Sequence, residues 1–89
     1  MKGIITVLGR DRVGIIAEVC AFLSQREINI LDISQTIVQG FFSMLMIVDM
    51  GPAGAQIEQC AKDLGALGEA MGLEVKLQRE DIFEAMHRI

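Results

Sequence analysis

The twenty residues IITVLGRDRVGIIAEVCAFL, at positions 4–23, change their hydrophobic period half-way, and this change decides the fold class. The first five form a β-branched run that is apolar on both faces, as is typical of a central strand. After Gly14, apolar residues recur at helical spacing, at Ile16, Val19, Cys20 and Leu23. The segment therefore predicts a strand and a helix joined by the loop G-R-D-R-V-G at 9–14, with Asp11 as the expected N-cap of the helix.

The rest of the chain continues this alternation of strands and helices. Residues 29–39 mix apolar and polar side chains like a partly exposed strand, and residues 41–50 return as a nearly continuous apolar strand after a turn at Gly40. A second helix is expected from Pro52 to Met71, and residues 73–78 alternate like an edge strand with one wet face. The run Asp81-Ile82-Phe83-Glu84 has the form of a capping box, which predicts a short terminal helix. Its apolar side, expected to pack on the sheet or on a neighbouring subunit, consists of Ile82, Phe83, Met86 and Ile89.

The order β-α-β-β-α-β predicts an α+β protein with a ferredoxin-like sandwich fold. In the simplest arrangement, a four-stranded antiparallel sheet has its first and third strands in the centre and two helices on one face, because helical crossovers are right-handed. The 89 residues make one small domain over 1–79, followed by a helical extension over 80–89.

Composition and charge exclude several classes of partner. A net charge of −4 argues against nucleic-acid binding, which needs clustered Lys and Arg. No apolar run reaches the ~18 residues of a membrane helix. Cys20 and Cys60 lie in helical patterns and indicate buried thiols in a reducing cytosol, so we expect a cytoplasmic protein. His87 is the only histidine and has no ligand constellation nearby, so neither a metal site, a cofactor nor a catalytic base is expected.

Two runs together resemble the ACT domain, a small regulatory module: GRDRVGIIAEV at 9–19 and EINILDISQT at 27–36. The resemblance spans residues 2–79, and the tail REDIFEAMHRI at 79–89 resembles that of small stand-alone ACT-domain proteins of uncharacterised function. It implies a non-enzymatic dimer that binds an amino acid or a related metabolite. The ligand would lie between the loop after the first strand and the start of the second strand of a neighbouring subunit. Carried onto this sequence, the implied site consists of Gly9, Arg10, Asp11, Arg12, Val13, Gly14, Asn29, Ile30 and Leu31.

The loop itself fits a zwitterion better than a phosphate. A P-loop needs Lys and Ser or Thr after its last glycine, where this chain has Ile15-Ile16, and the start of a dinucleotide fingerprint is absent. A helix N-terminus favours a carboxylate, and Asp11 is able to pair with an amino group. The alternative is that the two glycines only permit a tight turn and that Asp11 only caps. Two departures from the common ACT pattern are Val13, where many members have Pro, and Glu27, where many have Gly.

Three alternatives to a ligand sensor follow from the residues. The first is an ACT-like assembly module without a ligand, which Val13 and Glu27 favour. The second is an acylphosphatase-like enzyme, for which Arg10 and Asn29 are a superficial match. The third, an RNA-recognition domain, needs stacking aromatics that the first strand lacks.

Apolar residues on both faces of the first and third strands predict at least a homodimer. The two helices cover only one face, so a second subunit is the economical cover of the other. As a regulatory module, the protein would also act on a further protein target that its sequence does not identify.

Overall fold

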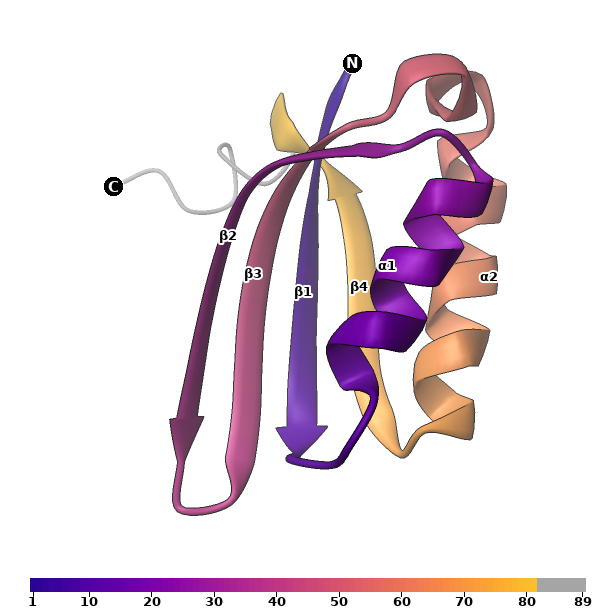
Figure 1. Cartoon of the computed structure of the whole chain (residues 1–89). Coiled ribbons are helices and arrows are strands. Elements are labelled where there is room, and N and C mark those ends of the chain that lie inside the picture. The colour runs from indigo at the N-terminus through magenta and orange to yellow at the C-terminus, as the bar shows by residue number, and fades with distance from the viewer. Residues whose placement is uncertain (82–89) are drawn as a thin grey trace.

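The computed structural model describes residues 1–81, and its elements follow the predicted order (Figure 1). The terminal helix predicted over 82–89, with its apolar side and His87, lies outside the described residues. The elements are β1 (Lys2–Arg10), α1 (Ile15–Gln25), β2 (Asn29–Val38), β3 (Phe41–Asp49), the 3-10 helix η1 (Gly51–Gln56), α2 (Ile57–Ala70) and β4 (Leu73–Arg79). The predicted ferredoxin-like fold is confirmed, with one refinement: the segment after Pro52 forms a 3-10 turn before the α-helix begins at Ile57.

The four strands form one antiparallel sheet in the order β2-β3-β1-β4, so β1 and β3 are central, as predicted. Both helices lie on one face of this sheet (Figure 1). Strand β4 has the expected wet face, since Leu73, Val75 and Leu77 are buried while the alternating Glu74 and Lys76 are exposed. The period-2 pattern of an edge strand is therefore realised here.

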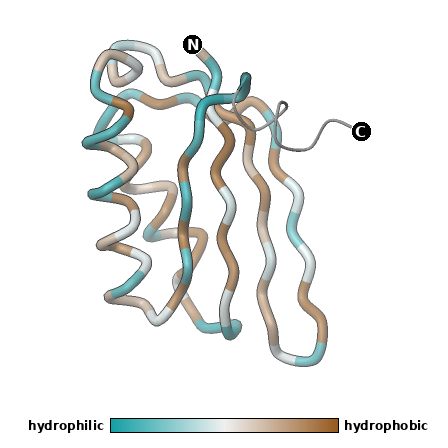
Figure 2. Tube along the Cα trace, turned by 180° about the vertical axis from the view of Figure 1, so that it is seen from behind, coloured by the Kyte–Doolittle hydropathy of each residue, from teal (hydrophilic) through white to brown (hydrophobic). Residues whose placement is uncertain are grey.

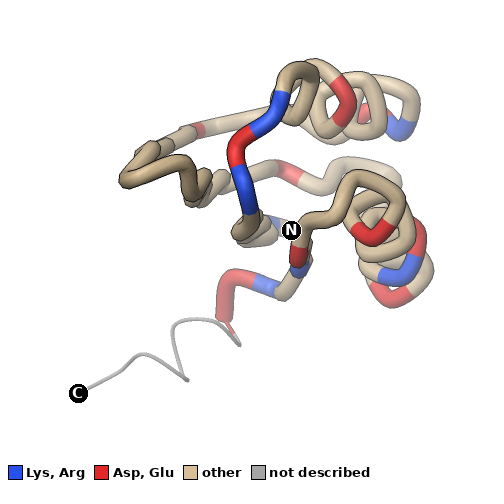
Figure 3. Tube along the Cα trace, turned by 90° about the horizontal axis from the view of Figure 1, so that it is seen from below, with Lys and Arg blue, Asp and Glu red and all other residues tan. Residues whose placement is uncertain are grey.

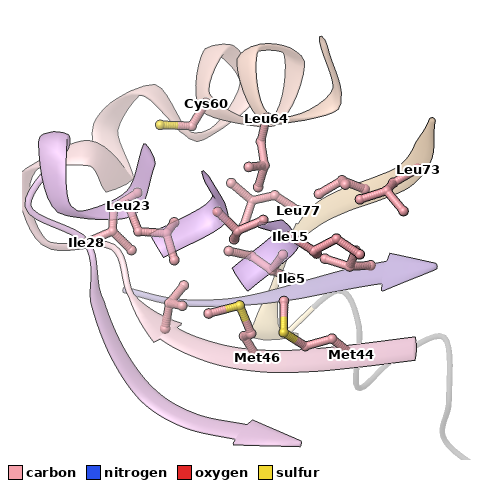
Figure 4. Close-up of a cluster of buried hydrophobic side chains, with 14 of the residues drawn as sticks. Ile5, Ile15, Leu23, Ile28, Met44, Met46, Cys60, Leu64, Leu73 and Leu77 are labelled. Carbon is pink, nitrogen blue, oxygen red and sulfur yellow. The ribbon is translucent and has the colours of Figure 1, made fainter. Parts of the chain in front are cut away.

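The hydrophobic core fills the space between the helices and the sheet. Figure 4 shows Leu64 projecting from α2 toward the strands, and it belongs to the same core cluster as Ile5 and Leu77. Leu64, Ile5 and Met46 have no exposed surface, and burying such a side chain contributes roughly 1.5–3 kcal/mol. The three methionines of residues 41–50 belong to this core, so they fill volume on the helix side of the sheet.

The helices leave β2 uncovered. Ile33 and Ile37 pair with the core residues Met46 and Phe42 of β3 and so share their face, yet they are 42% and 56% exposed. In Figure 1 this strand lies at the sheet edge away from both helices, and Figure 2 shows a hydrophobic stretch on it close to the hairpin turn. Of the nine exposed large hydrophobic residues in the described part of the chain, four lie on β2. This edge is therefore an unusually apolar surface for a monomer.

The face of the sheet away from the helices is apolar mainly over β1 and β3. Leu8 and Phe41 are about half exposed there, and Leu45 and Ile47 are partly buried. On β2 the same face carries Asp32, Ser34 and Thr36, which pair with this row of β3. The second apolar face predicted from the sequence is thus a stripe over β1 and β3 that reaches the β2 edge at Val38, which pairs with Phe41 and is 59% exposed.

Helix α1 ends in a Schellman motif whose left-handed position is occupied by Glu27. The Ile28 amide donates to Leu23 O at 3.0 Å and the Glu27 amide donates to Ser24 O at 3.2 Å, the two bonds that define the motif. Glu27 has a φ of +58°, a conformation that costs a residue with a Cβ about 1–2 kcal/mol. The corresponding position after α2 is Gly72, with a φ of +73°. The position where many ACT domains have Gly is therefore one that the backbone favours for Gly.

We expect Glu27→Gly to stabilise the protein by about 0.5–1 kcal/mol. Removing the strain of a left-handed backbone at residue 27 outweighs the extra conformational entropy that glycine loses on folding. A thermal unfolding scan should show a melting temperature higher by roughly 2–8 °C. Glu27→Ala is the matched control, since it removes the carboxylate but keeps the Cβ. Equal stability of the Gly and Ala variants would show that the backbone at residue 27 is not strained.

Candidate functional site

The loop after β1 is shorter than its glycines suggest, because Gly9 and Arg10 belong to the strand. Helix α1 has Gly14 as its N-cap, with a φ of +93°, and no described side chain caps it. The predicted cap by Asp11 is therefore wrong. Asp11 lies four residues before the first helical residue, and its own amide donates to Gly40 O in the β2–β3 turn at 2.8 Å.

The two glycines of the loop have different structural roles. A Cβ at Gly9 would lie 2.5 Å from Leu73 Cδ2, so Gly9 permits close packing of β1 against the start of β4. A Cβ at Gly14 would meet nothing within 4 Å, so this glycine serves the left-handed backbone conformation alone. For both glycines, the turn and its packing are sufficient explanation.

The first turn of α1 presents backbone amides that no described side chain caps. The first intrahelical bond runs from the Glu18 amide to Gly14 O at 2.9 Å, so the amides of Ile15, Ile16 and Ala17 precede the ladder. A helix N-terminus carries a partial positive charge, and its free amides are suited to a carboxylate.

Charged side chains alternate along the loop, as the blue-red-blue segment of Figure 3 shows. The Arg10 guanidinium lies 5.3 Å from the centre of the Phe41 ring, and Arg12 Nη1 donates to Met71 O at 3.3 Å. Val13 is 96% exposed. Arg10 is thus directed toward the Phe41 ring and Arg12 toward the turn before β4. Asp11 and Arg12 both line a groove beside α1.

That groove, of about 270 Å³, runs between the first turn of α1 and the hairpin arm of β2 and β3. It is lined by Asp11, Arg12, Gly14, Ile15, Ile16, Ala17, Gln35, Ile37 and Phe42. The loop residues were predicted, but the hydrocarbon wall and Gln35 were not. The strand order contained the missing signal, since Gly9 pairs with Phe42 and Phe42 pairs with Ile37.

The second predicted half of the site lies at the opposite end of the sheet. Asn29 pairs with Asp49, and Asp49 pairs with Lys2 at the start of β1, whereas the loop follows the end of β1. Eight residue steps separate these ends, or roughly 26 Å at 3.3 Å per residue. Within one chain, Asn29 is therefore far from the loop, because the chain returns through α1 to the other end of the sheet before β2 begins.

The residues around Asn29 form a groove of their own. Asn29 and Ile30 line it together with Glu27 and the last turns of α1, and its volume is about 430 Å³. The neighbouring Leu31 is 47% exposed and lies at a bulge in the pairing of β2 with β3. One chain thus carries the two predicted halves of the site as separate surfaces.

The described residues bring together neither a group of metal ligands nor the pair considered for acyl-phosphate chemistry. They contain no group of three or more His, Cys, Asp or Glu side chains that could hold a metal ion. Arg10 and Asn29, the pair considered for acyl-phosphate chemistry, lie at opposite ends of the sheet. Within residues 1–81, no helix has the length and apolar character needed to cross a membrane.

Comparison with known proteins assigns the family. The sequence model of the ACT domain matches residues 3–78. The chain belongs to the ACT domain family. Its sequence is 52% identical over 88 residues to a UPF0237 protein of Bifidobacterium longum, a match that covers 99% of this chain and 98% of that one. A UPF0237 protein of Methanocaldococcus jannaschii is 44% identical over 86 residues, which cover 97% of this chain and 96% of the relative.

A solved ACT structure has the same architecture as this ACT domain. The ACT domain protein from Streptococcus pneumoniae superimposes with a TM-score of 0.82 at 34% sequence identity, and the match covers 98% of each chain. ACT domains are generally regulatory modules that bind small ligands, and they commonly oligomerise. The resemblance inferred from residues 9–19 and 27–36 is confirmed at the level of family and fold.

Proposed function

We propose that this ACT domain is a non-enzymatic sensor that binds an amino acid or a closely related small acid in the groove beside α1. One observation carries the proposal: the groove joins the uncapped first turn of α1 to the exposed Asp11 carboxylate and to a hydrocarbon wall. The amides suit the ligand's carboxylate, Asp11 suits its ammonium group, and the wall suits its carbon skeleton. Backbone amides alone would bind many anions, so Asp11 is what selects a zwitterion.

We further propose that the functional unit is a C₂ dimer in which two β2 edges pair antiparallel. No described strand pairs with the outer edge of β2, and such an edge is a template for a further strand. Antiparallel pairing centred near Ile33 and Ser34 sets the start of one β2 against the end of the other. Because Ile37 lines the groove and the Asp11 amide is bonded to Gly40, the end of β2 lies beside the ligand loop. Asn29 of a second subunit would thereby complete the site.

The β2 edge fits this role better than the opposite face of the sheet. Pairing there buries the exposed Ile33 and Ile37 of both subunits on the helix side, next to the half-exposed Ile16 of α1. A second subunit packed on the other face of the sheet would cover Leu8 and Phe41 but would leave these isoleucines exposed to water. Only the edge pairing also joins the two halves of the predicted site.

The sensor would transmit its state to a protein target in the cytoplasm. Cys20 and Cys60 are both free thiols, and Cys60 is buried, which suits a reducing compartment. Ligand binding across the β2 edge would stabilise the dimer, so a target protein that recognises the dimer would respond to the ligand concentration.

An amino acid from a mixture of the common ones is expected to raise the melting temperature of the protein, and Asp11→Asn is expected to remove most of that rise. Hydrogen bonds to charged groups contribute about 1.5–3 kcal/mol, so the variant should bind roughly 10–100-fold more weakly. Thermal shift at a series of ligand concentrations measures both.

Asp81→Asn is the matched control, because it makes the same chemical change on an exposed side chain beyond the end of β4. It should leave the shift intact. If no amino acid or related small acid moves the melting temperature, the chain functions as an assembly module without a ligand.

A further inference from the structure

The groove beside α1 has its charges at one end and hydrocarbon along the rest. Of its lining residues, only Asp11 and Arg12 carry a charge, and both belong to the loop. Arg12 directs its guanidinium to Met71 O, away from the space between α1 and β2. A ligand held at the loop by its amino and carboxylate groups would therefore extend its side chain along an uncharged channel.

The walls of this channel are aliphatic and incompletely buried. Ile16 on α1 is 37% exposed and Ile37 on β2 is 56% exposed, and Phe42, which is 3% exposed, forms the floor between them. Exposed β-branched side chains on both sides of a groove are unfavourable in water and become favourable when an apolar group enters. These apolar walls distinguish the groove from a simple anion site, which would need only the charged loop.

From these features we infer that the groove selects amino acids with an uncharged aliphatic side chain. The inference rests on the proposed function, because it names the class of ligand for the same site. An ionised side chain between Ile16 and Ile37 would lose its hydration without gaining a partner, which disfavours acidic and basic amino acids. Gln35 is the one uncharged polar side chain on the wall, and it lies between Ile33 and Ile37 on that face of β2. A hydroxyl or amide side chain is therefore the competing class.

The test is a calorimetric titration of the full chain with glycine, alanine, 2-aminobutyrate, norvaline and leucine, with serine, asparagine, aspartate and lysine for comparison. Affinity is expected to rise by up to about fourfold for each added methylene, from a burial free energy of ~0.8 kcal/mol per group. The polar and charged amino acids should bind more weakly than the aliphatic one of similar size. Equal affinity along the aliphatic series, or tighter binding of serine, asparagine, aspartate or lysine, would overturn the inference.

A variant pair tests the wall directly. Ile37→Ala is titrated at a protein concentration at which light scattering shows that it is still dimeric, because Ile37 also lies at the proposed β2 interface. Under that condition the variant should bind leucine roughly tenfold more weakly and glycine with nearly unchanged affinity, since the ligand loses only its side-chain contact. Leu8→Ala removes a similarly exposed aliphatic side chain from the other face of the sheet and should alter neither affinity.

The outcomes separate this inference from the proposed function. If glycine or a polar amino acid binds best, or if Ile37→Ala weakens all ligands equally, the aliphatic selection is refuted and amino-acid sensing stands. If none of the nine amino acids binds but another amino acid or small acid raises the melting temperature, only the aliphatic selection is refuted. If no such ligand raises it either, both are refuted.

Discussion

Gly68→Ala is expected to destabilise the protein, while Gly65→Ala, three residues earlier on the same helix, is expected to stabilise it. A Cβ at Gly68 would lie 2.5 Å from Val75 Cγ2, 2.9 Å from Val75 Cβ and 3.2 Å from Leu73 O. The two closest of these atoms belong to a stiff β-branched side chain and the third to the backbone of β4, so neither gives way easily. At Gly65 the nearest atom is Val75 O at 3.9 Å, an ordinary contact.

Both substitutions gain the same helix propensity, about 1 kcal/mol for Gly to Ala in a helix interior. Gly65→Ala should therefore raise the free energy of unfolding by up to that amount. At Gly68 the forced separation of α2 from β4 costs about 1–3 kcal/mol or more, as in other overpacked cores, and should exceed the propensity gain. Thermal unfolding should separate the two variants by roughly 4–24 °C, since they differ by the overpacking cost of about 1–3 kcal/mol and 1 kcal/mol corresponds to about 4–8 °C for a domain of this size.

The two glycines are each other's control, because they share helix α2 and the chemical change. Equal melting temperatures for the two variants would mean that α2 does not pack on β4 as closely as described.

Ile33→Asp is expected to convert the proposed dimer into a monomer without unfolding the chain. Ile33 is 42% exposed on β2, so a carboxylate there remains hydrated in the monomer. In the dimer, edge pairing brings the two copies of residue 33 close to the symmetry axis, so both apolar contacts are lost and two like charges face each other. The dimer should weaken on the order of 100-fold, because each loss occurs twice. Light scattering over a range of micromolar concentrations measures the mass.

Leu8→Asp provides the matched control on the other face of the sheet. Leu8 is 53% exposed on β1, so the same change can be made there without removing core packing. We expect this variant to remain dimeric. Dissociation by Leu8→Asp but not by Ile33→Asp would place the partner on the apolar stripe of β1 and β3, where the sequence alone first suggested it. A wild-type protein that is monomeric at every concentration would refute both interfaces and the shared site.

The order and type of the elements could be predicted because they depend on local periodicity. The switch from a β-branched run to helical spacing around Gly14, and the strict alternation of residues 73–78, are set by which face each side chain must bury. The strand order followed, since β-α-β-β-α-β with right-handed crossovers leaves few topologies.

The candidate site was predicted only in its first half. The residues of the loop are contiguous in sequence, so their proximity needed no tertiary knowledge. The wall formed by Ile16 and Ile37 was missed because these residues lie 21 positions apart and meet only through the register of β2, β3 and β1. The Asp11 cap was wrong because a tertiary hydrogen bond to Gly40 and a left-handed Gly14 delay the start of α1 to Ile15.

Sequence alone thus determined the fold, the central strands and the position of the loop after β1, since the hydrophobic period and the turn residues are set over a few neighbouring positions. Only the tertiary structure decided that Asn29 lies roughly 26 Å from that loop, because the chain returns through α1 to the other end of the sheet before β2 starts. It also decided that β2 stays largely uncovered, because the two helices pack over the other three strands and do not extend across β2. The exposed isoleucines of that strand are the physical reason why we propose both the ligand groove and the subunit edge there.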